Sequence, residues 1–188
     1  MQTIHQVLIL TCALVVLSAC ASPSSPKPTP PGQSDSVDAG FVYGFIEIDN
    51  QNEVVERIDF IEYGRVYVPP FTNPPRVLVY TNGVFMAENI KPGRYIISSI
   101  HTERNNYKLA RNKRLSYQKI FHIKPGEMEY LGAYNLRVTE KGQLDYGELK
   151  IRELQRPGER DVLKELFELT EDTLWQDKIA RRLRQLYQ

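Results

Sequence analysis

The stretch Gly83–Ile97, GVFMAENIKPGRYII, contains the signals that decide the fold. Asn82-Gly83 opens it, and this dipeptide between apolar segments is a strong signal for a β-hairpin turn. Further on, Lys91-Pro92-Gly93-Arg94 places proline and glycine at the two central positions of a type II turn. The apolar segments beside these turns, Val84–Ala87 and Tyr95–Ile100, are therefore expected to be strands.

The same pattern of short apolar segments and turn signals continues through residues 41–151. Strands that arrive about every ten residues favour an all-β sandwich or barrel over alternating βα units. The expected strands are 41–48, 54–63, 67–68, 76–81, 84–87, 95–100, 117–123, 128–138 and 144–151. In the segment 128–138, strict alternation predicts that one face carries Met128, Tyr130, Tyr134, Leu136 and Val138.

IKPG occurs a second time at Ile123–Gly126, and Pro157-Gly158 follows at nearly the same interval. Strand-like segments follow the first two turns and a helix-like segment follows the third, so only the turn is repeated. True repeats carry the same structural unit in each period. The even spacing therefore does not indicate a repeat protein.

Helical periodicity begins near residue 159 and is typical of two amphipathic helices. Thr173 with Gln176 three residues later matches a capping box at the start of the second helix. We expect the two apolar stripes to cover the sandwich, and the alternative is that the Trp175 stripe docks a partner. The stripes consist of Val162, Leu163, Leu166 and Phe167, and of Trp175, Ile179, Leu183 and Leu186.

The opening stretch resembles the signature of the carboxypeptidase-regulatory-like domain. The matching residues are Gly83, Phe85, Ile90, Pro92, Gly93 and Tyr95. The resemblance implies a transthyretin-type antiparallel β-sandwich of about seven strands. The motif of this family carries no catalytic residues, and such domains also occur in bacterial lipoproteins of unknown role. The resemblance therefore implies a fold and transfers no activity.

The N-terminus has the features of an export signal. Val7–Leu17 reads VLILTCALVVL, which is shorter than the roughly 20 residues of a membrane span and fits a signal-peptide core. It ends in Leu17-Ser18-Ala19-Cys20, which resembles a bacterial lipobox. The resemblance implies cleavage before Cys20 and acylation of its thiol. The first six residues depart from the pattern, because His5 stands where lysine or arginine is usual.

Residues 21–36, ASPSSPKPTPPGQSDS, are too rich in proline and serine to form a core, and we expect an extended tether. An aspartate directly after the lipidated cysteine would resemble an inner-membrane retention signal. Ala21 stands at that position, and this favours attachment to the outer membrane, facing the periplasm. The expected organisation is a signal peptide at 1–19, a lipidated cysteine and tether at 20–39, the sandwich at 40–152 and the helices at 153–188.

Few residues have the spacing that metal binding requires. His101 and Glu103 share one face of an expected strand, and His122 on a neighbouring strand could complete a two-histidine carboxylate site. No HExxH or clustered Cys/His pattern supports this hypothesis. The alternative, which we favour, is that both histidines make ordinary hydrogen bonds. We therefore expect no metal and no cofactor.

The sequence offers little for catalysis either. Ser98 and Ser99 lack the Gly-x-Ser-x-Gly context of a nucleophile, and both cysteines belong to the expected leader and anchor. Strand-borne carboxylates occur, but their pairing at glycosidase distance cannot be derived from one sequence. These carboxylates are Glu47, Asp49, Asp59 and Glu62.

Positive charge gathers in the segment 104–119, RNNYKLARNKRLSYQK, which has six bases and no acid although the whole chain has a net charge of +1. We call it the basic segment. Such a segment can bind anionic polymers or lipid head groups, and the alternative is a solvated connection balanced by acids elsewhere. The candidate ligand-binding residues are Arg104, Lys108, Arg111, Lys113, Arg114 and Lys119.

Together these features predict a lipid-anchored cell-envelope protein whose sandwich is a non-catalytic binding or structural module. Its expected partners are the membrane, through the anchor, and an anionic envelope polymer or envelope protein. The low net charge and the export signal argue against nucleic acid. Two alternatives stay open: an envelope hydrolase acting on glycan or peptide, and an accessory subunit that docks a larger assembly through its C-terminal helices.

Overall fold

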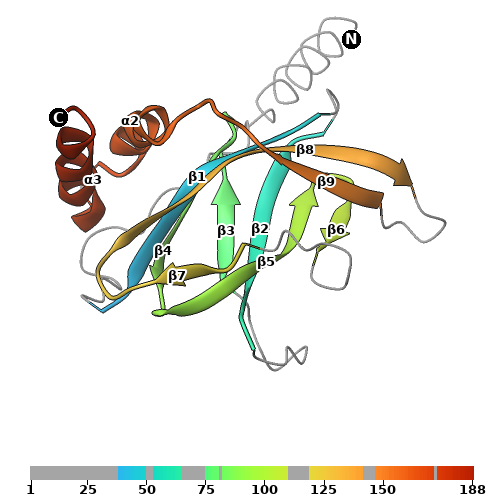
Figure 1. The fold of residues 1–188 in the computed structure, drawn as a ribbon, viewed down its shortest axis with the longest axis horizontal. Helices are drawn as coiled ribbons and strands as arrows, with labels where there is room; N and C mark the ends of the chain where they lie inside the picture. The colour runs from blue at the N-terminus through green and yellow to red at the C-terminus, as the bar shows by residue number, and fades with distance from the viewer. Residues whose placement is uncertain are drawn as a thin grey trace, which may run out of the picture.

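The computed structural model describes residues 38–49, 53–64, 75–80, 82–109, 119–141, 147–171 and 173–188. In this part of the chain nine strands precede two C-terminal helices, so the protein is mainly β (Figure 1). The strands are β1 (Gly40–Ile48), β2 (Val55–Glu62), β3 (Arg76–Val79), β4 (Val84–Ile90), β5 (Gly93–Thr102), β6 (Asn106–Lys108), β7 (Phe121–Ile123), β8 (Met128–Lys141) and β9 (Gly147–Glu153). The helices are α2 (Glu159–Leu169) and α3 (Leu174–Gln185).

Hydrogen bonds join the strands in the order β6-β5-β2-β3-β4-β1-β8-β9, and β7 pairs with β5. The sheet folds over itself at β3, which pairs with both β2 and β4. One layer then contains β1, β4, β8 and β9, and the other contains β2, β3, β5, β6 and β7. The expected β-sandwich is confirmed. It is not wholly antiparallel, because β1 and β8 pair in parallel.

The main core lies between the two layers. Phe85 and Leu136 from one layer and Ile58, Phe60 and Ile100 from the other are all fully buried there. Apolar side chains at alternate positions of each strand point inward, as a two-layer sandwich requires. The inward residues of both layers therefore share one hydrophobic core.

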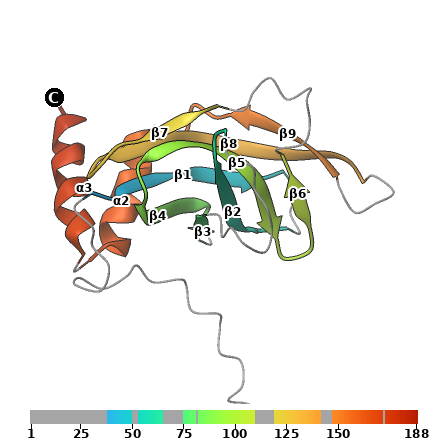
Figure 2. The ribbon, with the colours of Figure 1, turned by 90° about the horizontal axis from the view of Figure 1, so that it is seen from below.

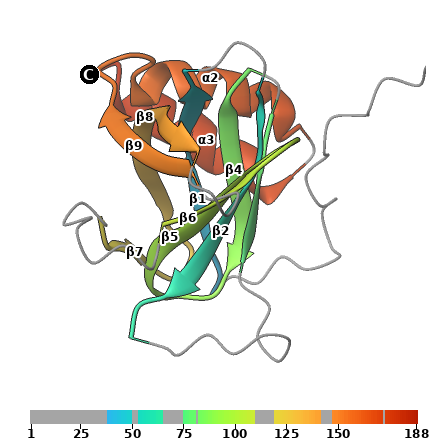
Figure 3. The same cartoon turned by 90° about the vertical axis from the view of Figure 1, so that its right-hand side faces the viewer.

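A second core forms where α2 and α3 cover the outer face of β1 and β4 (Figure 3). Phe41 and Tyr43 alternate with the inward Val42 and so point toward the helices, where Leu166 and Trp175 are also buried. Trp175 packs against Phe41 with ring centroids 4.9 Å apart. The Trp175 stripe is thus occupied by the sheet and is not open to a partner.

A carboxylate network fastens the helices to β1. The Tyr43 hydroxyl donates to Glu159 Oε1 at 2.7 Å, and Arg182 donates to both oxygens of Glu159 at 2.8 and 3.1 Å. Burial, followed by the hydrogen bond to Glu159, raises the pKa of Tyr43. The bidentate contact fixes α3 against the start of α2, because such paired charge-assisted bonds are directional.

The two IKPG turns differ in backbone conformation. Gly126 has φ 66° and the Glu127 N–H donates to the Lys124 carbonyl at 3.3 Å, as a type II turn predicts. The predicted type II turn at Lys91–Arg94 is wrong, because Gly93 does not have positive φ. A Cβ on Gly93 would lie 3.2 Å from the Tyr95 ring, whose hydroxyl donates to the Lys91 carbonyl at 2.8 Å. A larger residue there would require the Tyr95 ring to shift by a few tenths of an ångström.

The predicted hairpin turn is confirmed, since Gly83 has φ 85° between the antiparallel strands β3 and β4. The predicted single face of 128–138 is wrong. A register shift beside Gly132, which has φ 116°, interrupts the alternation of β8. Met128 and Tyr130 therefore pack on the helix side, whereas Leu136 lies in the main core.

The predicted capping box of α3 does not form. Thr173 makes no side-chain cap, and its hydroxyl donates to the Thr170 carbonyl at 2.7 Å. At α2 the Asp161 carboxylate accepts instead from the Gly158 N–H at 3.2 Å. Neither α2 nor α3, the helices of the described ranges, has the length and apolarity of a membrane-spanning helix.

Candidate functional site

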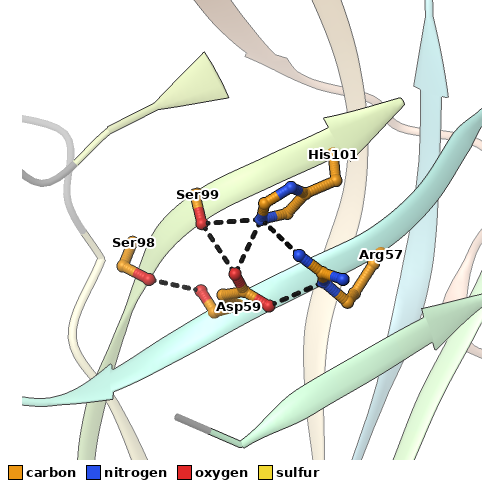
Figure 4. Close-up of polar contacts among 5 residues, drawn as sticks. All are labelled: Arg57, Asp59, Ser98, Ser99 and His101. Carbon is orange, nitrogen blue, oxygen red and sulfur yellow. Dashed lines mark hydrogen bonds and ion pairs between the residues drawn. The ribbon is translucent and has the colours of Figure 1, made fainter. Parts of the chain in front are cut away.

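Polar side chains of β2 and β5 meet on the outer face of their layer (Figure 4). Asp59 Oδ2 lies 2.7 Å from His101 Nε2 and accepts from Ser99 Oγ at 3.0 Å. Its other oxygen, Oδ1, accepts from Arg57 Nε at 3.0 Å. We call Arg57, Asp59, Ser99 and His101 the Asp59 cluster. Asp59, which accepts from every other member, is its centre.

A β-bulge in β5 determines that Ser99 and His101 face the same side of the sheet as Asp59. Tyr95 and Ile100 both belong to the main core although five positions separate them, so one extra residue must lie between them. The register shifts opposite Asp59 and Phe60, and the Ser98 hydroxyl donates to the Asp59 carbonyl at 2.9 Å. A bulge reverses which face later residues occupy. It therefore turns Ser99 and His101 outward, toward Asp59.

The contacts around His101 fix its tautomer. At 2.7 Å from a carboxylate oxygen, Nε2 must carry a proton, since two unprotonated acceptors repel each other. Arg57 Nη2 also lies 3.0 Å from Nε2, but arginine only donates. Nε2 cannot serve both partners at once, so the hydrogen bond of Arg57 is the one that its Nε makes to Asp59. The Asp59 carboxylate thus receives three donors.

This geometry differs from that of a serine nucleophile. In a Ser-His-Asp triad the serine faces one ring nitrogen and the carboxylate faces the other. Here Ser99 and Asp59 both lie against Nε2, at 3.1 and 2.7 Å. His101 has no free lone pair toward Ser99, whose own proton is directed to Asp59. The cluster is a hydrogen-bond network that joins β2 and β5.

The hypothetical metal site does not form, because its histidines are far apart. His122 of β7 lies opposite Arg94, seven positions from His101 along β5, or about 23 Å at the usual rise. His122 is exposed, whereas His101 contacts Asp59. Within the described ranges no three His, Cys, Asp or Glu side chains are grouped for a metal ion.

The basic segment is attached to the sheet at both ends. Lys108 of β6 lies opposite Ser99, and Phe121 of β7 lies opposite Tyr95. Because β2 occupies one edge of β5, both short strands share the other edge. Arg104 and Lys119 are exposed. Arg111, Lys113 and Arg114, like the lipidation candidate Cys20, lie outside the described residues.

A second network secures the start of the basic segment. Glu53 accepts from Thr102 Oγ1 at 2.8 Å, from Asn105 Nδ2 at 2.8 Å and from the Tyr107 hydroxyl at 3.0 Å. Burial, and then Glu53, raises the pKa of Tyr107 to about 12. Sequence reasoning missed this network and strand β6. Glu53 is about fifty positions from its partners, and no local pattern indicates the contact.

Comparison with known proteins gives one weak structural match. No family model matches the chain, and no curated protein matches it. A crystal structure of a DUF3823 family protein from Parabacteroides merdae is similar, with a TM-score of 0.28 and 14% sequence identity. The match covers 65% of this chain and 62% of that chain, which is less than two thirds of the latter.

Proposed function

We propose that this chain is a lipid-anchored protein of the cell envelope, placed in the outer membrane and facing the periplasm, whose sandwich is a non-catalytic binding module. The anchor rests on Leu17-Ser18-Ala19-Cys20 and on the proline- and serine-rich residues after it. Several acyl chains attach a protein stably, at about 0.8 kcal/mol per buried CH₂. A tether then holds the sandwich away from the bilayer.

The observation that carries the binding role is the attachment of the basic segment to β5. Binding residues commonly lie on loops that a rigid scaffold positions. β6 and β7 hold the two ends of this segment on one edge of β5, and Glu53 fastens its first turn. Six bases without an acid favour an anionic partner. The proposed ligand is an envelope polymer that carries carboxylate or phosphate groups.

We also infer that the sandwich is of the carboxypeptidase-regulatory-like, transthyretin type. The residues of the signature have structural roles that support this inference. Gly83 makes the hairpin turn, Phe85 and Ile90 are buried, and the Tyr95 hydroxyl bonds back to the Lys91 carbonyl. The last contact is of the kind that fixes tyrosine corners in other sandwiches. All of these residues serve the fold, which agrees with a module without catalysis.

Reversing the charge of the basic segment tests the binding role. The triple variant Arg111→Glu, Lys113→Glu and Arg114→Glu is expected to lower capture of lipopolysaccharide and peptidoglycan by at least tenfold, because each exchange replaces an attraction by a repulsion. Capture of purified polymers by the immobilised protein measures the effect. The control is Arg137→Glu, an exposed base on β8. Equal capture by the triple variant and the parent protein would refute this role.

The anchor has a separate test in cells. Cys20→Ser removes the thiol to which the lipid is attached, so the variant is expected to remain uncut and to lose all labelling by a fatty-acid probe. Cys12→Ser is the matched control, because this second cysteine lies inside the expected leader. Labelling that persists in Cys20→Ser, or that disappears in Cys12→Ser, contradicts the proposed anchor.

A further inference from the structure

The turn between β3 and β4 contains the chain's one Asn-Gly pair, Asn82-Gly83. An asparagine amide is chemically labile when the peptide nitrogen of the next residue can attack its Cγ atom. Glycine has no Cβ, so it leaves that nitrogen less hindered than any other residue does. Asn82 is exposed, and water therefore reaches its side chain. The pair that makes the hairpin turn is thus also a reactive amide.

The other asparagines of the described ranges lack this arrangement. Each is followed by a residue with a side chain, and these asparagines are Asn89, Asn105, Asn106 and Asn135. Three of the following residues, Ile90, Tyr107 and Leu136, are buried in the main core, which holds the backbone there in place. Among the described asparagines, reactivity is therefore expected at Asn82.

The fold holds both polar atoms of the Asn82 amide. Its Oδ1 accepts from the Val84 N–H at 3.1 Å, and its Nδ2 donates to Glu165 Oε2 at 3.3 Å. An N–H donor at Oδ1 stabilises the negative charge that develops on this oxygen when Cγ is attacked. The Gly83 N–H donates to the Tyr80 carbonyl at 2.8 Å, and this hydrogen bond must open before the nitrogen can attack.

The hydrogen bond from Asn82 to Glu165 also joins the β3–β4 turn to α2, and we call it the turn–helix hydrogen bond. Figure 2 shows α2 beside β1 and β4. The inner side of α2 is held by the second core, where Leu163 and Leu166 are fully buried, whereas Glu165 is exposed. A carboxylate only accepts hydrogen bonds, so this contact depends on the amide donor of Asn82.

We propose that Asn82 deamidates spontaneously and that the carboxylate formed there breaks the turn–helix hydrogen bond. The Gly83 nitrogen loses its proton and bonds to Cγ of Asn82, the bond from Cγ to Nδ2 breaks, and ammonia leaves with that proton. Water then opens the succinimide at either carbonyl, which gives aspartate or isoaspartate. Asparagine and water thus become an acid and ammonia, without oxidation or reduction. The new carboxylate faces Glu165, and neither group can donate to the other.

Mass spectrometry of the purified full chain, incubated at mildly alkaline pH, tests the reaction. Trypsin releases Asn82 and Asn89 in one peptide, residues 77–94, because the Lys91-Pro92 bond resists cleavage, so Asn89 is an internal control. Relative to a sample digested without incubation, acid is expected to accumulate at Asn82 and not at Asn89. Asn82→Gln is expected to abolish it. An unchanged Asn82, or equal conversion at Asn89, would overturn the proposal.

Urea unfolding of Asn82→Asp, which reproduces the aspartate product, tests the effect on α2. The folding equilibrium constant is expected to fall about fivefold, the effect of two like charges about 4 Å apart in water. Glu165→Gln offers a donor to the new carboxylate, so in this background Asn82→Asp should change the constant less than about twofold. Equal losses in both backgrounds would assign the effect to the turn alone and refute the role of Glu165. Neither experiment depends on the anchor or the basic segment.

Discussion

Raising the pH above about 10 is expected to unfold this protein steeply, because the folded chain holds five tyrosines in their protonated form. Burial is the largest cause at each of them. It raises the pKa of Tyr80, Tyr107, Tyr130 and Tyr134 from 10.0 to about 12, and that of Tyr43 still further. Exposed to water in the unfolded chain, the same side chains ionise near the ordinary value of 10.0.

The direction in which the free energy of unfolding changes with pH follows from proton binding. Between pH 10.0 and about 12 the folded chain binds more protons than the unfolded chain, so the free energy of unfolding falls as the pH rises. The contribution of these tyrosines is fully present below pH 10.0 and is lost toward pH 12. Each tyrosine contributes at most about 1.4 kcal/mol per pH unit to this slope. The partly exposed Tyr130 and Tyr134 contribute less, because solvent screens them.

Lys178 changes the free energy of unfolding in the opposite direction as the pH rises. Burial lowers the pKa of its amine, so its contribution grows as the pH rises, but it is one group against five. Urea midpoints measured at intervals between pH 8 and 11, with tyrosinate absorbance recorded alongside, test the prediction. Tyr80→Phe should make the slope shallower by about 1.4 kcal/mol per pH unit. Complete ionisation of all the tyrosines near pH 10 while the fold persists would contradict it.

Local signals allowed most elements of this fold to be predicted. The Asn82-Gly83 hairpin and the helical periodicity after residue 158 depend on neighbouring residues, which a sequence displays directly. The IKPG turns show where such reasoning ends. Gly93 and Gly126 stand in identical tetrapeptides, yet only Gly126 has positive φ, because Gly93 is the first residue of β5 and pairs with Ile123 of β7. A tertiary contact selects the conformation that the local sequence leaves open.

The same limit applies to the candidate site. The positive charge of the basic segment is a matter of composition and was visible at once. The Asp59 cluster could not be predicted, because the bulge at Ser98 has no sequence signal. The bulge exchanges the inward and outward positions of the β5 residues that follow it. The partner of His101 lies 42 residues away on β2, which bears out the favoured interpretation that His101 makes an ordinary hydrogen bond, and His122 lies opposite Arg94 at the other end of β5. Strand pairing is set by the whole fold.

Replacing Trp175 by alanine is expected to lower the free energy of unfolding by about 3–5 kcal/mol, the range for deleting a large buried aromatic side chain. The Trp175 side chain is 4% exposed, packs on Phe41 and lies under the Lys178 amine, whose Nζ is 4.3 Å from the ring centroid. Its removal leaves a cavity between α3 and β1. Urea unfolding of the parent and the variant measures the loss.

Two further variants make this result specific. Leu174→Ala changes the adjacent residue, which is 53% exposed, and should cost no more than about 0.5 kcal/mol. Trp175→Phe keeps an aromatic ring in the site. It also removes an indole N–H that is buried without a hydrogen-bond partner among the described residues. The free energy of unfolding should therefore fall by less than half as much in Trp175→Phe as in Trp175→Ala. If Trp175 existed mainly to dock a partner, Trp175→Ala would leave stability unchanged. A large loss instead means that the inner face of α3 serves the sandwich and is not available to a partner.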